Sequence, residues 1–277
     1  MVSEAVALQR VDAEARIAFR RRGARTVLAD LYASGGARLA LPRGSPDSRT
    51  EAVLVNTAGG LTGGDRLTLA AMLHDGANAR LTTQAAEKIY RSIDGPAVLR
   101  NSLSLGPGSR AEWLPQETIL FDGAALDRRL DVDLAPDAQL LAVEAAILGR
   151  TARGERVAQG SLRDSWRVRR TSRLLFADSI RLEGEIARHA AGPATLRGAC
   201  AFATVLYVAS DAAARLDPLR EALDPGSGTG VEAGASLVAG LLVARMLAPD
   251  GLALRRALVP ALARLRDGRP APRLWTC

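Results

Sequence analysis

The stretch "RRLDVDL", residues 128–134, alternates between apolar and charged side chains. Its apolar residues Leu130, Val132 and Leu134 would lie on one face of an extended chain, with charged residues between them on the other face. A period of two residues is typical of a half-buried β-strand, because successive side chains point to opposite faces. This stretch therefore predicts a sheet with one face in a core and one face in solvent.

Similar stretches occur on both sides of it. Residues 65–73 and 98–105 also alternate, and residues 51–55 form a short apolar run. Turn signals such as "HDGAN", "IDGP", "LGPGSR" and "LAPDA" separate these stretches at roughly the 8–12-residue spacing of an all-β fold. No helical pattern of 10–15 residues interrupts residues 15–208, which argues against a doubly wound nucleotide-binding fold. We see no clear sequence repeat.

The last quarter of the chain carries helical signals. Residues 210–223 begin with capping residues and continue with helix formers, with a kink expected at Pro218. Residues 252–266 place leucines at helical spacing, and Pro260 would break this helix or start its second half. We therefore predict two helices in the C-terminal region.

The segment between these helices, residues 235–248, is ambiguous. It could form two short strands around Gly240 or one buried helix, and the bounding glycine and "APDG" favour strands. The predicted fold is mainly β: a large, helix-poor, antiparallel or β-helix-like body over residues 1–209. Residues 210–277 are predicted to form an α+β segment packed on that body, so that a single structural unit results.

The chain is basic in an unusual way. Its 277 residues have a net charge of +7, and Lys88 is the one lysine, so arginine supplies almost all of the positive charge. Such a balance favours acidic partners. An alanine- and arginine-rich chain is also typical of a GC-rich genome, which weakens that argument. The single lysine has two explanations. The position of Lys88 requires a compact ammonium group, or the lysine survives there by chance.

Residues 163–173 contain a candidate basic stripe. Read as a strand, they place Arg163, Arg167 and Arg169 on one face. That face would suit an acidic partner, and a solvated strand face is the alternative that we favour slightly. A nucleic-acid-binding β protein is therefore the second candidate function, although the chain lacks the aromatic residues that stacking platforms use.

Cysteine and histidine patterns exclude several kinds of site. Cys200 and Cys277 lie far apart, and so do His74 and His189, which indicates neither a disulfide framework nor a zinc or nickel site with His/Cys spacing. Ser–His or Cys–His catalysis has little support, and nothing singles out the carboxylate pair that a hydrolase would need. No signal peptide or membrane span of ~20 apolar residues is present, so we expect a soluble cytoplasmic protein.

The glycine-rich stretch "GGLTGGD", residues 59–65, lies between two predicted strands. A phosphate-binding loop needs a following helix and a different glycine spacing, so this loop is not expected to bind GTP. Two alternatives remain for it. It is a tight hairpin whose glycines adopt positive φ, or its backbone must approach another chain or a channel closely, with Asp65 fixed at the mouth of the strand.

Several acidic residues lie in apolar surroundings. Gln116, Glu117 and Asp122 occur within the largely apolar residues 113–124, and Glu144 lies inside an apolar run. Burying an unpaired charge costs several kcal/mol, so such carboxylates need a partner, water or a metal ion. For Glu144 an ion pair with an arginine is the simple alternative, and for residues 113–124 it is exposure on alternating faces.

Five segments together resemble one family. In chain order they are "NTAGGLTGGDRL", "TTQAAEKIYRS", "EWLPQETILFDGA", "LLAVEAAILGRTARGE" and "APRLWTC". This order resembles the urease accessory protein UreD family, called UreH in some organisms, from about residue 14 to the end. The resemblance implies a non-enzymatic scaffold for nickel insertion into apo-urease. It also implies that UreF binds directly, that UreG is recruited through UreF, and that UreE is the nickel donor.

The resemblance further implies a water-filled internal tunnel as the nickel path. Weak ligation by carboxylates would suit transit of Ni²⁺ better than storage. No tightly bound cofactor is expected, and GTP would belong to the partner GTPase. The residues proposed to meet Ni²⁺ in transit are Asp65, Glu144, Glu117, Asp122 and Glu155. The matched motif residues are Gly59, Gly60, Gly63, Gly64, Lys88, Tyr90, Arg91, Pro115, Gln116, Gly149 and Arg150. Glu87 departs from the family, whose members can carry a small residue there, so it receives no tunnel role.

Overall fold

The computed structural model describes residues 9–42, 49–150, 153–224 and 229–275, and its strands form two large sheets. Sheet A has the order β14-β13-β11-β8-β5-β1-β2. These strands are β1 (Asp12–Arg22), β2 (Arg25–Ser34), β5 (Arg66–Leu73), β8 (Ala97–Leu105), β11 (Ala125–Leu134), β13 (Gln159–Arg170) and β14 (Arg173–Glu185).

Sheet B has the order β16-β17-β15-β12-β9-β6-β4-β3, with short strands β7 and β10 beside β12. Its strands are β3 (Ala37–Ala40), β4 (Thr50–Asn56), β6 (Asn78–Thr83), β7 (Glu87–Ile89), β9 (Arg110–Leu114), β10 (Thr118–Leu120), β12 (Gln139–Leu148), β15 (Ala201–Val208), β16 (Glu232–Val238) and β17 (Leu241–Ala248).

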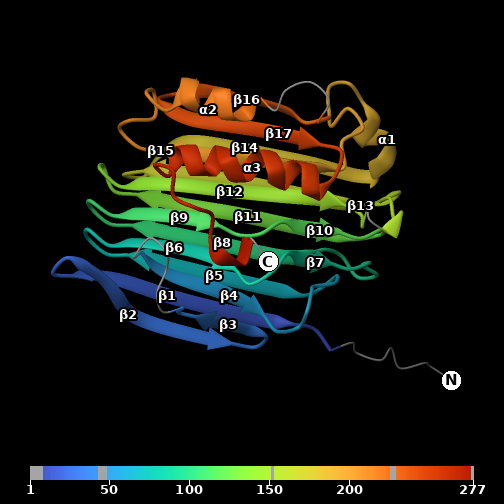
Figure 1. The fold of residues 1–277 in the computed structure, drawn as a ribbon. Helices are drawn as coiled ribbons and strands as arrows, with labels where there is room; N and C mark the ends of the chain where they lie inside the picture. Colours follow the sequence, from blue (N-terminus) through green and yellow to red (C-terminus); the bar gives the residue numbers. More distant parts are fainter. Residues whose placement is uncertain (1–8, 43–48, 151–152, 225–228, 276–277) are drawn as a thin grey trace.

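The chain coils between the two sheets. From β4 to β13 the long strands fall alternately in sheet B and sheet A, and their neighbours within each sheet run parallel. Antiparallel pairs occur at the two ends of the coil, such as β1 with β2 and β13 with β14. Figure 1 shows this order as a progression of colour across the stacked strands. The mainly β, β-helix-like fold predicted from the sequence is therefore confirmed.

Tight corners close one edge of the coil. Each joins a strand of sheet A to one of sheet B through four residues, at 74–77, 106–109 and 135–138. Successive corners stack, because the Gly76 amide donates to the Pro107 carbonyl at 2.8 Å and the Arg110 amide to the Ala77 carbonyl at 2.9 Å. The coil is thus a structural repeat that the sequence does not reveal, since only turn geometry and side-chain burial recur.

The main core lies between the sheets. Leu130, Val132 and Leu134 of β11 are all buried, as the alternation of the opening stretch predicted. Parallel register aligns Leu134 with Leu105 of β8 and Leu105 with Leu73 of β5, so that leucines of successive coils stack on one another. A chain with few aromatic residues obtains a continuous core in this way, because each coil buries its apolar side chains against the next.

Two helices cover the other face of sheet B (Figure 1). They are α2 (Leu216–Leu223) and α3 (Gly251–Leu265), and their buried leucines pack on outward-facing residues of β12, β15 and β17. Sheet B is therefore the middle layer of three. The strands β16 and β17 from the segment 210–277 extend this same sheet.

The helices differ from the prediction in detail. The helix α2 begins at Leu216, so Pro218 lies in its first turn, where proline is tolerated, and causes no kink. The helix α3 continues through Pro260 because its apolar face is buried and Asp250 caps its start by accepting from the Ala253 amide at 2.8 Å. Residues 235–248 form strands around Gly240, as favoured.

One helix escaped the sequence analysis. The helix α1 (Ile186–Ala191) lies inside the region expected to lack helices, and six residues are too short to show a helical period. The strand expected over residues 163–173 ends earlier in the structure. The strand β13 ends at Arg170, and a turn with positive φ at Thr171 and Ser172 follows.

We predict that Leu258→Ala destabilises the protein by about 2–5 kcal/mol, because Leu258 is fully buried between α3 and sheet B. Leu252→Ala on the same helix is the matched control, since Leu252 is 60% exposed. It should cost less than about 0.5 kcal/mol. Urea unfolding of both variants measures the difference, and equal costs would contradict the packing of α3 described above.

Candidate functional site

The long connections gather on the edge opposite the corners. This surface, the loop edge, is formed by residues 57–65, 84–96, 115–124, 149–150 and 153–158. Each connection bonds to the next: the Tyr90 amide donates to Leu61 at 2.7 Å, Phe121 to Ile89 at 3.0 Å and Gly149 to Leu120 at 2.8 Å. The motif segments that are separate in the sequence therefore form one continuous surface.

The glycine-rich loop crosses from β4 in sheet B to β5 in sheet A, so the hairpin alternative is wrong. Positive φ is confirmed at Gly59, Gly60 and Gly64. The alternative of close backbone approach is also supported, but toward the same chain. A Cβ at Gly63 would lie 1.8 Å from Ser92 Oγ, and one at Gly60 would lie 2.4 Å from a ring carbon of Tyr90. The loop packs directly against the next coil.

Asp65 ties this loop to the first strand. It is buried, and its Oδ1 and Oδ2 accept backbone N–H groups of Val11 and Thr62, each at 2.8 Å. Backbone donors thus occupy both oxygens, a setting that the sequence did not indicate. The position at the mouth of β5 is as expected.

An open hollow of about 600 Å³ lies at the far end of the loop edge, beside Asp122 and Glu155. Asp122 Oδ1 accepts from the Ala158 amide at 2.8 Å, and its Oδ2 pairs with Arg91 at 3.1 Å. Glu155 pairs with Arg150 at 2.7 Å. Hydrogen bonding from Arg150 holds the pKa of Glu155 below its ordinary value. Both carboxylates remain partly exposed to solvent in this hollow.

Aromatic and cationic side chains line the same hollow. The guanidinium of Arg150 lies over the Phe121 ring, 4.4 Å from its centroid. Tyr90 packs edge-on against Phe121 with centroids 5.0 Å apart, and its hydroxyl donates to the Gly59 carbonyl at 3.1 Å. Two matched motif residues, Tyr90 and Arg150, thus pack on the Phe121 ring, and Tyr90 joins this group to the glycine-rich loop. Lys88 is exposed nearby on β7.

Glu117 and Gln116 fasten the helix α3 to the loop edge. Arg255 donates to the two Glu117 oxygens at 2.9 and 2.5 Å and to Gln116 Oε1 at 3.1 Å. Glu117 is therefore buried in an ion pair, so the alternative of surface exposure is wrong for it. The neighbouring Pro115 is also buried. This contact links residues nearly 140 positions apart.

Glu144 lies between the sheets in a group of three buried charges. Its Oε2 is 2.6 Å from Arg128 Nη1, and its Oε1 accepts from Trp113 Nε1 at 2.9 Å. Arg128 also binds Asp164 at 2.6 Å. Burial raises the pKa of Glu144 to about 7, because Arg128 only partly offsets desolvation and Asp164 adds repulsion. The contacts match the ion-pair alternative for Glu144.

Sequence analysis missed Arg128 and Asp164. A signal was present, because Arg128 shares the parity of Leu130, Val132 and Leu134 in the opening stretch and so faces the core. Asp164 likewise shares the parity of the buried Trp166. Alternation is consistent with inward positions for both charges, although no such position was predicted, and the folded chain shows that they meet.

The basic stripe lies on the outer face of sheet A. Register places Arg163, Arg167 and Arg169 beside the aspartates of β11, and Arg169 approaches Asp131 at 3.6 Å. Interleaved opposite charges lower the positive potential of this face, which weakens the nucleic-acid alternative. The role of these three arginines in binding a partner stays a prediction.

No metal-binding group of three or more His, Cys, Asp or Glu side chains is present among the described residues. Cys200 is a free thiol, and Cys277 lies outside the described residues. The assignment of nickel transit to Asp65, Glu144, Glu117, Asp122 and Glu155 therefore stays a prediction. Within the described parts of the chain, no helix is long and apolar enough to span a membrane.

Comparison with known proteins decides the family. The family model described as UreD urease accessory protein matches residues 11–276. The chain belongs to the UreD family. One relative, named urease accessory protein UreD from Methylobacterium sp. (strain 4-46), is 51% identical over 256 residues, covering 91% of this chain and 90% of the relative. A relative of the same name from Sinorhizobium medicae (strain WSM419) is 46% identical over 272 residues, covering 98% of both chains.

Membership of the UreD family confirms the resemblance drawn from the five segments. Most of their motif residues lie on the loop edge, which is the candidate functional site. The tail segment, by contrast, follows α3, and its Trp275 ring lies under the guanidinium of Arg255.

We predict that Gly63→Ala destabilises this UreD protein by about 2 kcal/mol or more, because the added methyl group collides with Ser92 and the Gly95 carbonyl. Gly59→Ala is the matched control. It has positive φ but nothing within 4 Å of the new methyl group, so it should cost only about 1 kcal/mol. Thermal unfolding of both variants tests this, and a larger cost at Gly59 would contradict the close approach.

We also predict a pH signature for Glu144. Its raised pKa means that the folded chain holds a proton which the unfolded chain releases, so stability falls as pH rises from about 4.5 to about 7. The slope from one such group is at most about 1.4 kcal/mol per pH unit. Glu144→Gln cannot ionise and should flatten the decline measured by urea unfolding between pH 5 and 7.

Glu155→Gln is the control for this measurement. Arg150 lowers the pKa of Glu155. The stability that Glu155 contributes is therefore lost only as pH falls below the ordinary pKa of a glutamate. This variant should keep the slope of the unmodified chain between pH 5 and 7. Identical slopes for Glu144→Gln and the unmodified chain would contradict the raised pKa.

Proposed function

We propose that this chain is a non-catalytic scaffold of urease maturation that takes part in inserting nickel into apo-urease. The observation that carries the proposal is the family match over residues 11–276, together with relatives at 46–51% identity that are named urease accessory proteins. In this proposal UreF binds directly, UreG is recruited through UreF, the assembly docks on apo-urease, and UreE donates nickel.

The loop edge is the proposed working surface. Backbone hydrogen bonds fix each connection to the next, so its shape is set by the coil and does not depend on long flexible side chains. A rigid surface suits a docking role because little conformational entropy is lost when a partner binds. Arginine and aromatic side chains, both enriched at protein interfaces, stand at its exposed end in Arg91, Arg150 and Tyr90.

Nickel transfer is the finer part of the proposal. The cargo would meet Asp122 and Glu155 first, because these carboxylates are partly exposed in the open hollow. Both are paired with arginines, which would weaken their affinity for a cation. Oxygen ligands bind Ni²⁺ less tightly than imidazole or thiolate, so such a site would release the ion readily. Asp65, Glu117 and Glu144 lie deeper, and their carboxylate oxygens already have partners in the chain.

We predict that combining Asp122→Asn with Glu155→Gln lowers the nickel content of urease matured with the variant by at least several-fold. The amides keep the shape of the side chains and remove the two exposed negative charges. Asp133→Asn, an exposed carboxylate on the outer face of sheet A, is the control and should leave nickel content unchanged. Nickel per urease active site is measured beside co-purification with UreF.

The two measurements separate the parts of the proposal. Normal co-purification with low nickel supports transit through the hollow. Lost co-purification assigns these residues to docking and removes the transit role from them. Full nickel content with the double variant contradicts both roles. A chain that neither co-purifies with UreF nor supports urease activation, although folded, would overturn the scaffold proposal itself.

A further inference from the structure

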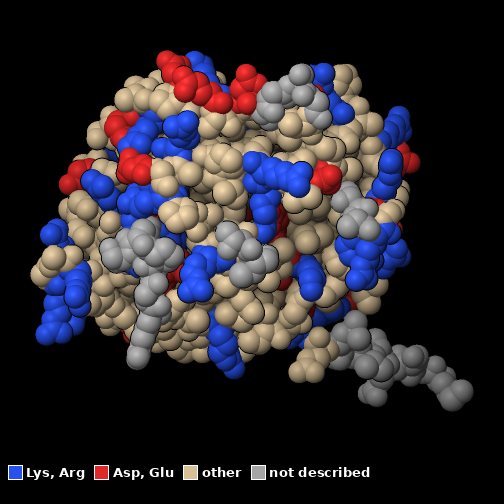
Figure 2. Space-filling model, viewed as in Figure 1, with Lys and Arg blue, Asp and Glu red and all other residues tan. Residues whose placement is uncertain are grey.

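A pocket of about 270 Å³ opens at the corner edge, between sheet B and the C-terminal end of α3. We call it the arginine pocket, because Arg49, Arg110, Arg215 and Arg269 line it. These residues come from four distant parts of the chain: the segment before β4, the start of β9, the segment before α2 and the segment after α3. In Figure 2, basic and acidic groups intermingle on the left of the face, where α3 ends.

The carboxylates of the pocket are already engaged. At its floor Glu112 pairs with Arg49 at 2.5 Å, Arg80 at 2.8 Å and Arg266 at 3.1 Å. These guanidinium groups hold the pKa of Glu112 below its ordinary value although burial opposes them. Glu112 therefore stays ionised, and its negative charge is more than balanced by the arginines around it.

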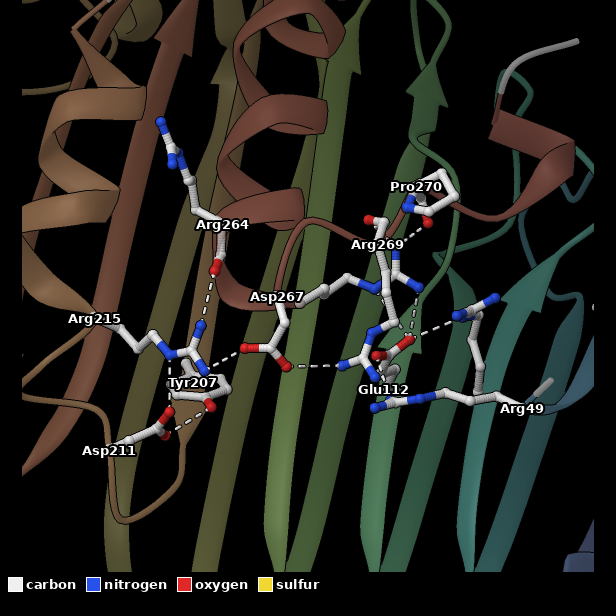
Figure 3. Close-up of polar contacts among 11 residues, drawn as sticks. Arg49, Glu112, Tyr207, Asp211, Arg215, Arg264, Asp267, Arg269 and Pro270 are labelled. Carbon is white, nitrogen blue, oxygen red and sulfur yellow. Dashed lines mark hydrogen bonds and ion pairs between the residues drawn. The ribbon is translucent and has the colours of Figure 1, made fainter. Parts of the chain in front are cut away.

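The two aspartates at the rim share one arginine. Arg215 binds Asp211 at 2.8 Å and Asp267 at 2.5 Å, and Asp211 also accepts from Tyr207 at 2.8 Å (Figure 3). Arg215 further donates to the Arg264 carbonyl in the last turn of α3 at 3.2 Å. This bond offsets the negative end of the helix dipole, which would otherwise repel an anion.

Two arginines of the pocket have N–H donors without a hydrogen-bond partner in the described structure. Arg110 is exposed, and its guanidinium has no hydrogen bond or ion pair within the described residues. The Nε atom of Arg269 is buried and lacks a hydrogen-bond partner in the described structure, while its Nη2 reaches Asp267 at 3.4 Å. A buried donor without a partner costs free energy, so Arg269 is not fully satisfied by the chain itself, and its side chain is 31% exposed where it lines the pocket.

We propose that the arginine pocket binds a small oxyanion of the phosphate class between Arg110 and Arg269. A tetrahedral oxyanion offers several acceptor oxygens at once, which suits guanidinium groups that approach from different directions. The pocket volume accommodates one such ion with a few waters. The inference is independent of the proposed function, because it uses only the charges and donors at this edge.

Occupancy would have a structural consequence. The ion would join Arg110 on β9 of the body to Arg269 in the segment that follows α3. Because the end of α3 is held to sheet B by the contact of Arg266 with Glu112, the ion would add a further link between the helical layer and the sheet. An ion that binds the folded chain and not the unfolded chain would raise the thermal stability of the protein.

The test titrates the full chain with inorganic phosphate at constant ionic strength and records the midpoint of thermal unfolding. We expect a rise that grows with the logarithm of the phosphate concentration above Kd and reaches about 3–6 °C at a concentration of about a hundred times Kd. Arg110→Gln and Arg269→Gln should each weaken phosphate binding by at least tenfold, measured by calorimetry. Arg66→Gln is the matched control, because Arg66 is likewise an exposed arginine at the start of a strand.

The same titration is repeated with acetate and with chloride, and their effects are compared with that of phosphate. Saturable phosphate binding that depends on Arg110 and Arg269, and not on Arg66, supports the proposal. Three results would each overturn it: no saturable phosphate binding in calorimetry, equal binding by all three variants, or a stronger effect of acetate, which would indicate a carboxylate site. Hydrogen exchange in the last turn of α3 gives a second readout and should slow with phosphate only in the unmodified chain and the control.

Discussion

A guanidinium buried between two sheets constrains this structure more than any other group. Arg128 needs acceptors on several sides, and it finds Asp164 on β13, Glu144 on β12 and Thr118 on β10. A shift of one residue in any of these strands would turn a partner to the opposite face and leave the charge unpaired, at a cost of several kcal/mol. The group thus fixes the register of both sheets and reaches the loop edge through Thr118.

Arginine is used repeatedly in this way, which gives the unusual composition a structural meaning. Arg80 binds Glu51 and Glu112, and Arg255 binds Glu117, Gln116 and the Trp275 carbonyl. One planar guanidinium can satisfy several acceptors at fixed angles, whereas an ammonium group is a point charge on a flexible stem. Buried polar contacts of this kind therefore hold neighbouring strands of sheet B together and fasten α3 to the loop edge, in addition to leucine packing.

These contacts bear on how a family member could act as a scaffold. The carboxylates that stood out in the sequence are engaged in the folded chain, Asp65 by backbone amides, and Glu117 and Glu144 by arginines. Asp122 and Glu155 stand partly exposed in an open hollow, and arginines balance them too. Such pairing keeps cations weakly held and keeps the loop edge rigid, and both properties suit transient assembly.

The sequence by itself determined the strands, the two main helices and the family, because alternation, helical spacing and five ordered segments are local or linear properties. The coil decided the rest, since parallel pairing joins residues about thirty positions apart in the chain, and the turn signals between them do not show which strands pair. Whether Glu144 faced water or an arginine depended on the register of β11 against β13 and on how the two sheets pack, which no single stretch of sequence specifies.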